Sequence, residues 1–555
     1  MLQTRLISSL DKCFPESSPL SFEPLTRLSA LRGETVSFQL VMRDDDPAAP
    51  HRRWAAPRLD GDLAAFATLR SVEYIPSLMP VYPSPSRSDD GYLKKEPGLY
   101  PDLLAPLGTG YGNGAHIAVC SFQTRALWVT IRLPDDLAAG DHSISVSLHD
   151  GAELSRDTLT VHVVPASLPA SDLPFTQWFH CDCLAQYYRV PVFSEEHWRI
   201  IENFARVAVS AGINTLLTPI FTPPLDTGIG HERLTVQLVG VRRRGVQYSF
   251  DYSLLDRWID MCRRIGIRYY EISHLFTQWG ASHAPKIMAD DEGEYRRIFG
   301  WDTDAAEGEY PRFLRIFLPD FIAHMKSMGE DGKCIFHISD EPNRDNLEQY
   351  TRSRAVVSDL LEGYTVMDAL SNLEFWKNGV VTTPVVAVNH IQPFIDNNVP
   401  NLWAYYCCGQ DVGVSNRFFA MPGARTRFIG WQLYKYNIAG FLQWGYNFYM
   451  NQGSYDEVDP FSDSTAQYFV PSGDAYSVYP APDGTAWESL RQVQFSEALQ
   501  DRQAALLCEG LVGRDRVLGA LEDICGDIVF SRCVCDSATA LLLREKINCL
   551  IEQNI

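Results

Sequence analysis

The sequence predicts an α/β protein in which an N-terminal antiparallel β-sandwich is followed by a (β/α)8 TIM-type barrel and a C-terminal helical extension. The first part contains runs of alternating apolar and polar residues, separated by turn residues. The pattern then changes to short apolar strands that alternate with long amphipathic helices, roughly eight times. The last part is helical in character. The predicted domains are therefore residues 1–170, 171–510 and 511–555.

The predicted sandwich rests on period-two alternation, which is typical of strands with one buried face. The alternating runs are Thr35 to Met42, Leu127 to Leu133, His142 to Leu148 and Asp157 to Val164. A long insert, Tyr82 to Gly114, is rich in Pro, Gly and Tyr, and we expect an ordered loop packed on a neighbouring segment. A proline-punctuated hinge, Pro165 to Pro174, marks the boundary to the second domain.

The second domain contains eight candidate strands separated by helical patterns. The candidates are Phe175 to His180, Thr215 to Ile220, Tyr269 to Ser273, Cys334 to Ile338, Tyr364 to Ala369, Pro384 to Val388, Leu402 to Cys407 and Gly440 to Gly445. Helices such as Glu195 to Ser210 and Tyr310 to Met328 connect them. Eight such units are what a closed parallel barrel needs, and its chemistry lies at the carboxyl ends of the strands.

Two adjacent carboxylates, Asp340 and Glu341, follow the fourth of these strands, in the stretch Phe336-His337-Ile338-Ser339-Asp340-Glu341-Pro342. Because proline restricts the residue before it, we expect Glu341 to adopt an extended or polyproline conformation. The two acids would then be held in a defined geometry at the barrel mouth. Solvated turn acids remain the alternative, since Asp-Glu-Pro occurs in ordinary turns.

Composition and charge narrow the classes of partner. The formal net charge of −21 argues against nucleic acid and against an anionic membrane, whereas a neutral small molecule remains compatible. We find no signal peptide and no apolar stretch that would span a bilayer, so we expect a cytoplasmic protein. The 13 scattered cysteines fit reduced thiols. No spacing is typical of a metal site, and we expect neither metal nor cofactor. The oligomeric state is left open.

The acid pair suits one kind of glycoside cleavage. Two carboxylates usually flank the scissile bond, but consecutive residues, with Cα atoms about 3.8 Å apart, come from one wall of a site. The seventh strand carries no carboxylate before Asp411, so a nucleophile is missing there. A 2-acetamido group on the substrate can supply it by forming an oxazolinium ion. Glu341 would then be the acid/base, and Asp340 would orient the acetamido N–H.

The stretch around Asp340 and Glu341 resembles the catalytic motif of glycoside hydrolase family 123, the β-N-acetylgalactosaminidases, and of its broader relatives. Further similar stretches are Arg427 to Gln432, Gly440 to Asn447, Gly473 to Pro480 and Glu488 to Arg491. The resemblance implies a β-sandwich followed by a (β/α)8 barrel, retention of configuration, and a catalytic Asp-Glu pair that falls on these two residues. The chain departs from the family pattern at Ala475, where we expect glycine, and in its longer tail beyond about Val512.

Six further residues are predicted to contact the sugar. They are Trp444, Asn447, Asp474, Tyr405, Trp279 and His274. Trp444 and Asn447 close the eighth strand, although Trp444 in the barrel core is the alternative. Asp474 lies in a glycine turn and is either a hydroxyl acceptor or a turn residue. Tyr405 shares one face of the seventh strand with Trp403. The remaining two follow the third strand.

The sequence-based hypothesis is a retaining, exo-acting glycoside hydrolase that cleaves terminal β-linked N-acetylgalactosamine from a glycan or glycoconjugate by substrate-assisted catalysis. Two alternatives remain. One is a glycosidase for another hexosaminide or a non-acetylated sugar, with Asp411, Asp456 or Asp474 as a separate nucleophile. The other is a carbohydrate-binding protein that turns nothing over, since many functions share this fold.

Overall fold

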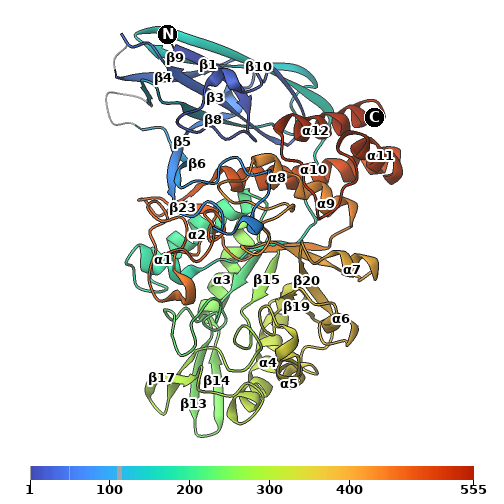
Figure 1. The fold of residues 1–555 in the computed structure, drawn as a ribbon. Helices are drawn as coiled ribbons and strands as arrows, with labels where there is room; N and C mark the ends of the chain where they lie inside the picture. Colours follow the sequence, from blue (N-terminus) through green and yellow to red (C-terminus); the bar gives the residue numbers. More distant parts are fainter. Residues whose placement is uncertain (1, 49–50, 109–114) are drawn as a thin grey trace.

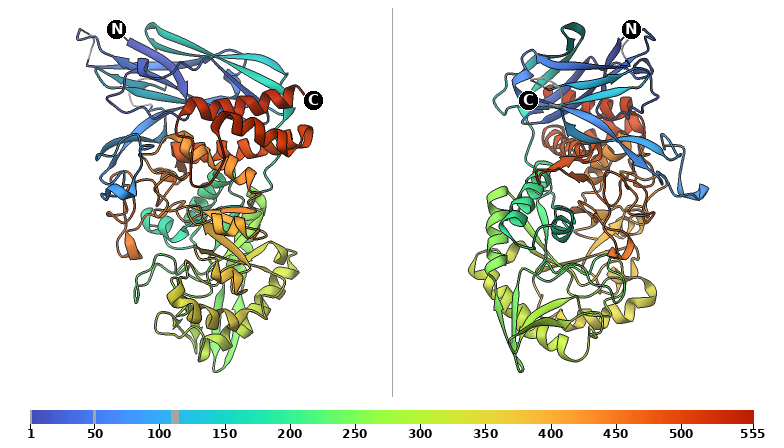
Figure 2. Two further views of the ribbon diagram at one scale, coloured as in Figure 1. Left: turned by 45° about the vertical axis from the view of Figure 1, so that its right-hand side comes forward. Right: turned by 90° about the vertical axis from the view of Figure 1, so that its left-hand side faces the viewer.

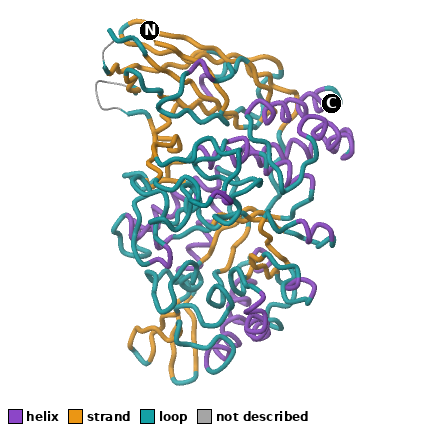
Figure 3. The backbone as a smooth tube through the Cα atoms, viewed as in Figure 1, coloured by secondary structure: helices purple, strands orange, loops and turns teal. Residues whose placement is uncertain are grey.

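The computed structural model describes residues 2–48, 51–108 and 115–555. Two packed sheets occupy one end of the molecule, and a closed barrel of eight strands lies below them (Figure 1). Both termini lie at the end with the two sheets (Figures 1 and 2). Strands dominate that end, whereas long loops surround the barrel (Figure 3).

The N-terminal sheets form the predicted sandwich. One sheet has the order β1 (Leu2–Ser8), β3 (Thr35–Asp44), β8 (Arg125–Arg132), β5 (Ala67–Ser77) and β6 (Gly98–Pro106). The other has the order β2 (Arg27–Arg32), β10 (Ala152–Ser167), β9 (Gly140–Asp150), β4 (Arg52–Asp60) and β7 (Ile117–Cys120). Inward residues of both, such as Phe38 and Ile144, share one core. The expected antiparallel pairing holds except between β2 and β10, which run parallel.

The insert between Tyr82 and Gly114 was expected to be a loop, but it contains strand β6. Residues 109–114 of this insert lie outside the described part of the chain. The insert packs on the barrel as expected, since the Tyr92 hydroxyl donates to the backbone oxygen of Asp411 at 2.7 Å.

All eight predicted barrel strands are confirmed, each within a few residues. They are β11 (Phe175–Gln177), β12 (Thr215–Thr218), β15 (Tyr269–Ile272), β18 (Cys334–Phe336), β19 (Thr365–Leu370), β20 (Thr383–Ala387), β21 (Trp403–Tyr405) and β22 (Gly440–Gln443). Each pairs in parallel with the next, and β22 pairs with β11 to close the barrel. Asp340 and Glu341 therefore follow the fourth strand, β18.

The outer layer has fewer full-length helices than a (β/α)8 barrel. The long helices that follow barrel strands are α2 (Glu195–Ser210), α3 (Ser253–Ile265), α4 (Glu309–Ser327) and α5 (Leu347–Val357). In contrast, α6 (Glu374–Lys377) has 4 residues and α7 (Gln392–Asp396) has 5. These two short helices are the ones that connect β19 to β20 and β20 to β21. Two further helices, α1 (Cys181–Tyr187) and α9 (Ile429–Lys435), have 7 residues each, and α8 (Gly423–Arg427) has 5.

A small sheet that we did not predict lies at the end opposite the sandwich (Figure 1). It contains β14 (Gln247–Asp251), β13 (Gly240–Arg244), β16 (Ile287–Asp291) and β17 (Glu294–Phe299). β13 and β17 are rich in arginine and lack the apolar alternation used for the prediction, whereas β14 alternates at Tyr248 and Phe250 and was missed. They extend the loops after β12 and β15. Beyond the barrel, a two-stranded hairpin joins β23 (Val478–Pro480) to β24 (Ala486–Glu488).

The C-terminal helices join the sandwich to the barrel. They are α10 (Leu490–Val512), α11 (Arg514–Cys525) and α12 (Ser537–Glu552). Arg491 on α10 forms a fully buried ion pair with Asp102 on β6 at 2.8 Å. Arg544 on α12 pairs with Glu34 of the sandwich at 2.6 Å. The tail is thus part of the domain interface.

The structure also bears on the expectations about thiols and membranes. All 13 cysteines fall within the described residues, and each is a free thiol. Within residues 2–48, 51–108 and 115–555, no helix has both the length and the apolar character needed to cross a bilayer.

Candidate active site

A pocket of about 200 Å³ opens at the carboxyl ends of the barrel strands. Its apolar lining includes Trp178, Trp444 and Phe469, and its polar lining includes Asp226, Gln278, Asp340, Glu341 and Tyr405. Barrel enzymes carry their chemistry at this face. A larger groove lies between the sandwich and α10, but its acids are paired: Glu488 with Arg70, and Glu497 with Arg427. The barrel pocket is therefore the candidate site.

Asp340 presents an unpaired carboxylate to this pocket. Its side chain is buried, and among the described residues we find no hydrogen-bond donor to its oxygens. Its backbone oxygen accepts the Trp279 N–H at 2.9 Å, which fixes the loop. Burial raises the pKa of Asp340 well above its usual range, and the negative charges of Glu341 and Asp226 add to this effect. A hydrogen-bond donor that enters the pocket would therefore favour the charged form of Asp340.

Glu341 does not have the backbone conformation that we predicted. It lies in the left-handed region, with φ of 44°, whereas the proline that follows it led us to expect an extended conformation. Proline favours extended backbone in the residue before it, so Pro342 does not account for the left-handed conformation of Glu341. Two other pocket residues, Asp226 and Trp279, also have positive φ, at 45° and 60°. Strained backbone of this kind concentrates at functional sites.

The Glu341 side chain is exposed at the pocket and touches the seventh strand. The Tyr405 hydroxyl donates a hydrogen bond to Glu341 Oε1 at 2.7 Å. Tyr405 and Trp403 lie in the same barrel-interior cluster, as their spacing on one strand predicted. Tyr405 therefore holds the predicted acid/base from across the barrel.

Two tryptophans form the aromatic wall, and buried carboxylates fix both. Trp444 Nε1 donates to Asp474 Oδ2 at 2.8 Å, and Trp178 Nε1 donates to Glu271 Oε1 at 2.7 Å. Asp474 is fully buried, and this burial raises its pKa to about 6 although Arg417 and Trp444 oppose the shift. Trp444 is partly exposed to the pocket, so it contributes to the site as well as to the core.

Three of the predicted contact residues, Tyr405, Trp279 and Trp444, line the pocket, and three do not. Asp474 lies behind Trp444. The Asn447 amide forms two hydrogen bonds with the backbone of His180, at 2.9 and 3.0 Å, and so positions a residue that does line the pocket. His274 is buried beneath the pocket, edge-on to Trp178 at 5.4 Å. These three support the walls.

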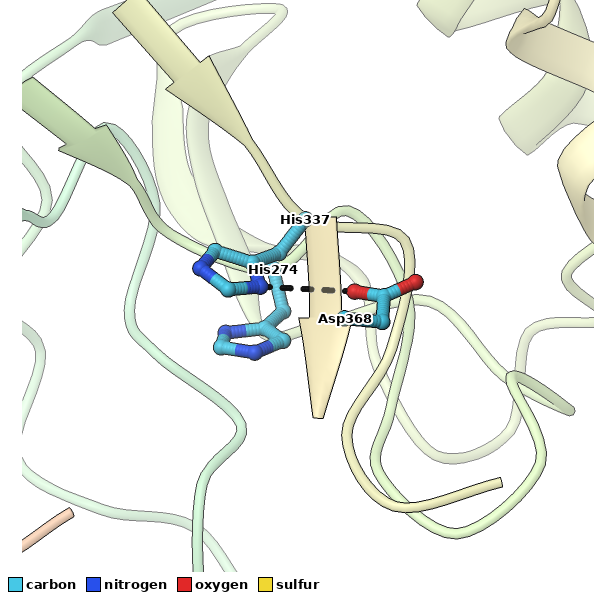
Figure 4. A group of neighbouring side chains, drawn as sticks. All are labelled: His274, His337 and Asp368. Carbon is cyan, nitrogen blue, oxygen red and sulfur yellow. Dashed lines mark hydrogen bonds and ion pairs between the residues drawn. The ribbon is translucent and has the colours of Figure 1, made fainter. Parts of the chain in front are cut away.

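A buried charge network, here called the floor, contacts Trp178 of the pocket lining. Figure 4 shows three of its members, His274, His337 and Asp368. His337 is fully buried between two acids, with Nε2 at 2.8 Å from Glu271 and Nδ1 at 3.3 Å from Asp368. Burial opposes its positive charge, but the hydrogen bonds to Asp368 and Glu271 prevail and raise the pKa of His337 to about 9. His274 stacks on its ring with centroids 4.3 Å apart. The two flanking acids thus favour the protonated form of His337.

This floor contains the one group within the described residues whose spacing suits a metal ion. It comprises His274, His337 and Asp368, with ligand atoms within 4.8 Å of one another. Asp368 Oδ1 already accepts hydrogen bonds from His337 and from the N–H groups of Ile338 and Ser339. The two imidazole planes are tilted by only 23°, so their in-plane lone pairs do not converge. The donors fit a charge network better than a metal site.

Four residues in or beside the pocket were not predicted from the sequence. They are Asp226, Gln278, Glu271 and Asp368. Asp226 follows β12 in a loop with three prolines, and only its place after a barrel strand gave a signal. Burial raises the pKa of Asp226 to about 7, against the opposing charge of Arg233.

None of the three acids considered as separate nucleophiles lines the pocket. Asp411 forms an ion pair with Arg87 at 2.5 Å. Asp456 is exposed and accepts a hydrogen bond from Asn451 at 3.0 Å. Asp474 is enclosed behind Trp444.

Comparisons with known proteins bear on the whole chain. A family model described as "Glycoside hydrolase 123, catalytic domain" matches residues 178–507, which include the pocket and both adjacent acids. A family 123 glycoside hydrolase from Clostridium perfringens, whose structure is described in terms of glycolipid glycan hydrolysis, is similar in fold. Its TM-score is 0.72 at 13% identity, over 100% of this chain and 98% of that chain.

Two β-glucuronidases have much lower TM-scores. Bacteroides uniformis beta-glucuronidase 3 gives 0.30 at 11% identity, over 90% of this chain and 51% of that chain. The Parabacteroides merdae enzyme gives 0.24 at 9% identity, over 80% and 46%. No match was found among curated proteins.

Proposed function

Because the chain belongs to glycoside hydrolase family 123, we propose that it is a retaining, exo-acting enzyme that removes terminal β-linked N-acetylgalactosamine by substrate-assisted catalysis. The observation that carries this proposal is the pair Asp340 and Glu341 at one rim of the pocket, with the Asp340 carboxylate unpaired among the described residues. A buried acceptor without a donor suits an acetamido N–H, since an unmet buried polar group is costly.

In the proposed first step, Glu341 protonates the glycosidic oxygen while the acetamido carbonyl oxygen of the substrate attacks the anomeric carbon. The glycosidic bond breaks, the aglycone leaves as an alcohol, and an oxazolinium ion forms. Asp340 accepts the acetamido N–H and stabilises the positive charge. In the second step, Glu341 removes a proton from a water molecule. The water oxygen attacks the anomeric carbon and opens the oxazolinium ring, which restores the acetamido group. Two inversions give net retention.

The size and lining of the pocket support exo action on one sugar ring. Its volume of about 200 Å³ lies below the range of roughly 300–1,000 Å³ typical of drug-sized ligands. Aromatic side chains such as Trp178 and Trp444 offer flat apolar surfaces for a pyranose. The Clostridium perfringens enzyme is linked to the hydrolysis of glycolipid glycans, and we extend this to a glycan or glycoconjugate substrate here.

One observation favours a second candidate function. Asp226 brings a third carboxylate to the pocket, from the loop after β12. A glycosidase with a separate nucleophile would need such a group on the opposite face of the sugar. This alternative predicts cleavage of sugars with a free 2-hydroxyl.

A screen of three aryl glycosides tests the proposal: β-N-acetylgalactosaminide, β-N-acetylglucosaminide and β-galactoside. We expect turnover of the first, and tight inhibition by a thiazoline that mimics the oxazolinium ion. The Asp340→Asn variant should lose activity while its circular dichroism spectrum stays unchanged. Cleavage of the galactoside alone would reject the proposal, and binding without turnover of any substrate would indicate a carbohydrate-binding protein.

A further inference from the structure

Asp226 is held in place by its backbone while its side chain stays free. Its N–H donates to Gln278 Oε1 at 2.5 Å, and its backbone oxygen accepts from the Ser454 hydroxyl at 2.7 Å. The adjacent Leu225 oxygen accepts from Arg233 Nη1 at 2.9 Å. Among the described residues we find no hydrogen bond or ion pair to the Asp226 carboxylate, which lines the pocket. The loop therefore presents a preorganised acceptor.

Gln278 adds a donor beside this acceptor. Its side chain is 5% exposed and lines the pocket, and its Nε2 has no hydrogen-bond partner among the described residues. Leaving a buried amide donor unpaired is unfavourable unless a ligand or water satisfies it. A carboxylate acceptor next to an amide donor matches a sugar hydroxyl, which both donates and accepts.

We infer that Asp226, supported by Gln278, binds one hydroxyl of the terminal sugar and thereby contributes to substrate selection. Asp340 and Glu341 act at the first two carbons of the ring, so the hydroxyl in question is the one at C3, C4 or C6. The inference rests on the proposed function for the identity of the sugar.

The test compares wild type, Asp226→Asn and Asp226→Ala on aryl β-N-acetylgalactosaminide and its 3-, 4- and 6-deoxy analogues. We expect the variants to lose about 10- to 100-fold in kcat/KM on the parent, the usual worth of a hydrogen bond to a charged group. On one deoxy analogue the loss should largely disappear, because the bonding hydroxyl is already gone. Asp456→Asn, an exposed acid outside the pocket, is the matched control.

Equal losses on all four substrates, or no loss, would overturn the inference. Azide rescue of Asp226→Ala with formation of a glycosyl azide would assign Asp226 as a nucleophile instead, and would overturn it as well. If wild type cleaves none of the substrates, the proposed function fails separately. Calorimetry then measures the affinity of wild type and Asp226→Asn for N-acetylgalactosamine and its deoxy forms. The inference holds if the affinity loss in Asp226→Asn largely disappears for one deoxy sugar, and it fails if the loss is equal for all.

Discussion

Tyr405 and Glu341 are joined by a hydrogen bond of 2.7 Å between the seventh and the fourth strand positions of the barrel. The donor is buried, and the acceptor belongs to a residue with left-handed backbone conformation. This bond sets the direction of the carboxylate that we propose as acid/base. It also explains how a residue that follows a short strand and precedes a proline keeps one orientation.

Replacing Tyr405 by phenylalanine should lower kcat/KM by about 10-fold or somewhat more, because a hydrogen bond to a charged group is lost. Activity on an aryl β-N-acetylgalactosaminide measures it. Tyr406→Phe is the matched control, since the Tyr406 hydroxyl is buried without a partner among the described residues and lies outside the pocket lining. Equal activity in both variants would show that the bond does not position Glu341.

Replacing Glu341 by glutamine should reduce the rate by about 10²- to 10⁴-fold, the usual contribution of a general acid. The loss should shrink as the aryl leaving group becomes more acidic, because such a group departs without protonation. Rates across a series of substituted phenols measure this dependence. A loss that is the same for every leaving group would contradict the acid role.

The buried ion pair between Arg491 and Asp102 should govern the stability of the sandwich–barrel interface. Arg491→Met leaves Asp102 buried without its partner and should lower the free energy of unfolding by about 3–5 kcal/mol. The exposed pair of Arg27 and Asp141 offers a contrast, because Arg27→Gln should cost no more than about 1 kcal/mol. Urea unfolding midpoints of the two variants compare them, and equal shifts would argue against the interface role.

Asp474 should make stability depend on pH. Its pKa in the folded protein is about 6, above the ordinary aspartate value of 3.8, so the folded state binds its proton more tightly. This contribution to stability is fully present below about pH 4 and is lost as the pH rises through 6. The melting temperature of wild type should therefore fall relative to that of Asp474→Asn between pH 4 and pH 7. A constant difference over this range would show that Asp474 does not titrate there.

The barrel strands were predictable because a strand that is buried on both faces must be a short apolar run. All eight predicted strands are present in the structure. The acid pair was predictable because it follows one of those strands. The short helices α6 and α7 were not predicted, since helices of 4 and 5 residues are too short to show an amphipathic period. In the small distal sheet, the arginine-rich strands β13 and β17 showed no apolar alternation to detect.

The rest of the site depends on contacts between distant segments. Asp226 and Gln278 lie in different loops and meet only in the folded barrel. Glu271 lies within an apolar strand, and its role is visible only from its hydrogen bonds to Trp178 and His337. Asp474 lies near the pocket as predicted, but it does not line the pocket. Trp444, which donates a hydrogen bond to Asp474, lines it instead. Spacing along one strand could not reveal these pairings.

The central claim is that the substrate's own amide attacks while one rim of the barrel supplies both acids. Its most direct test is the rate of wild type on aryl β-galactosaminides whose N-acyl group is acetyl, fluoroacetyl, difluoroacetyl or trifluoroacetyl. Each fluorine weakens the carbonyl oxygen as a nucleophile, so we predict a steep, progressive fall in kcat/KM. Rates that stay level across the series would place the nucleophile on the protein and contradict the mechanism.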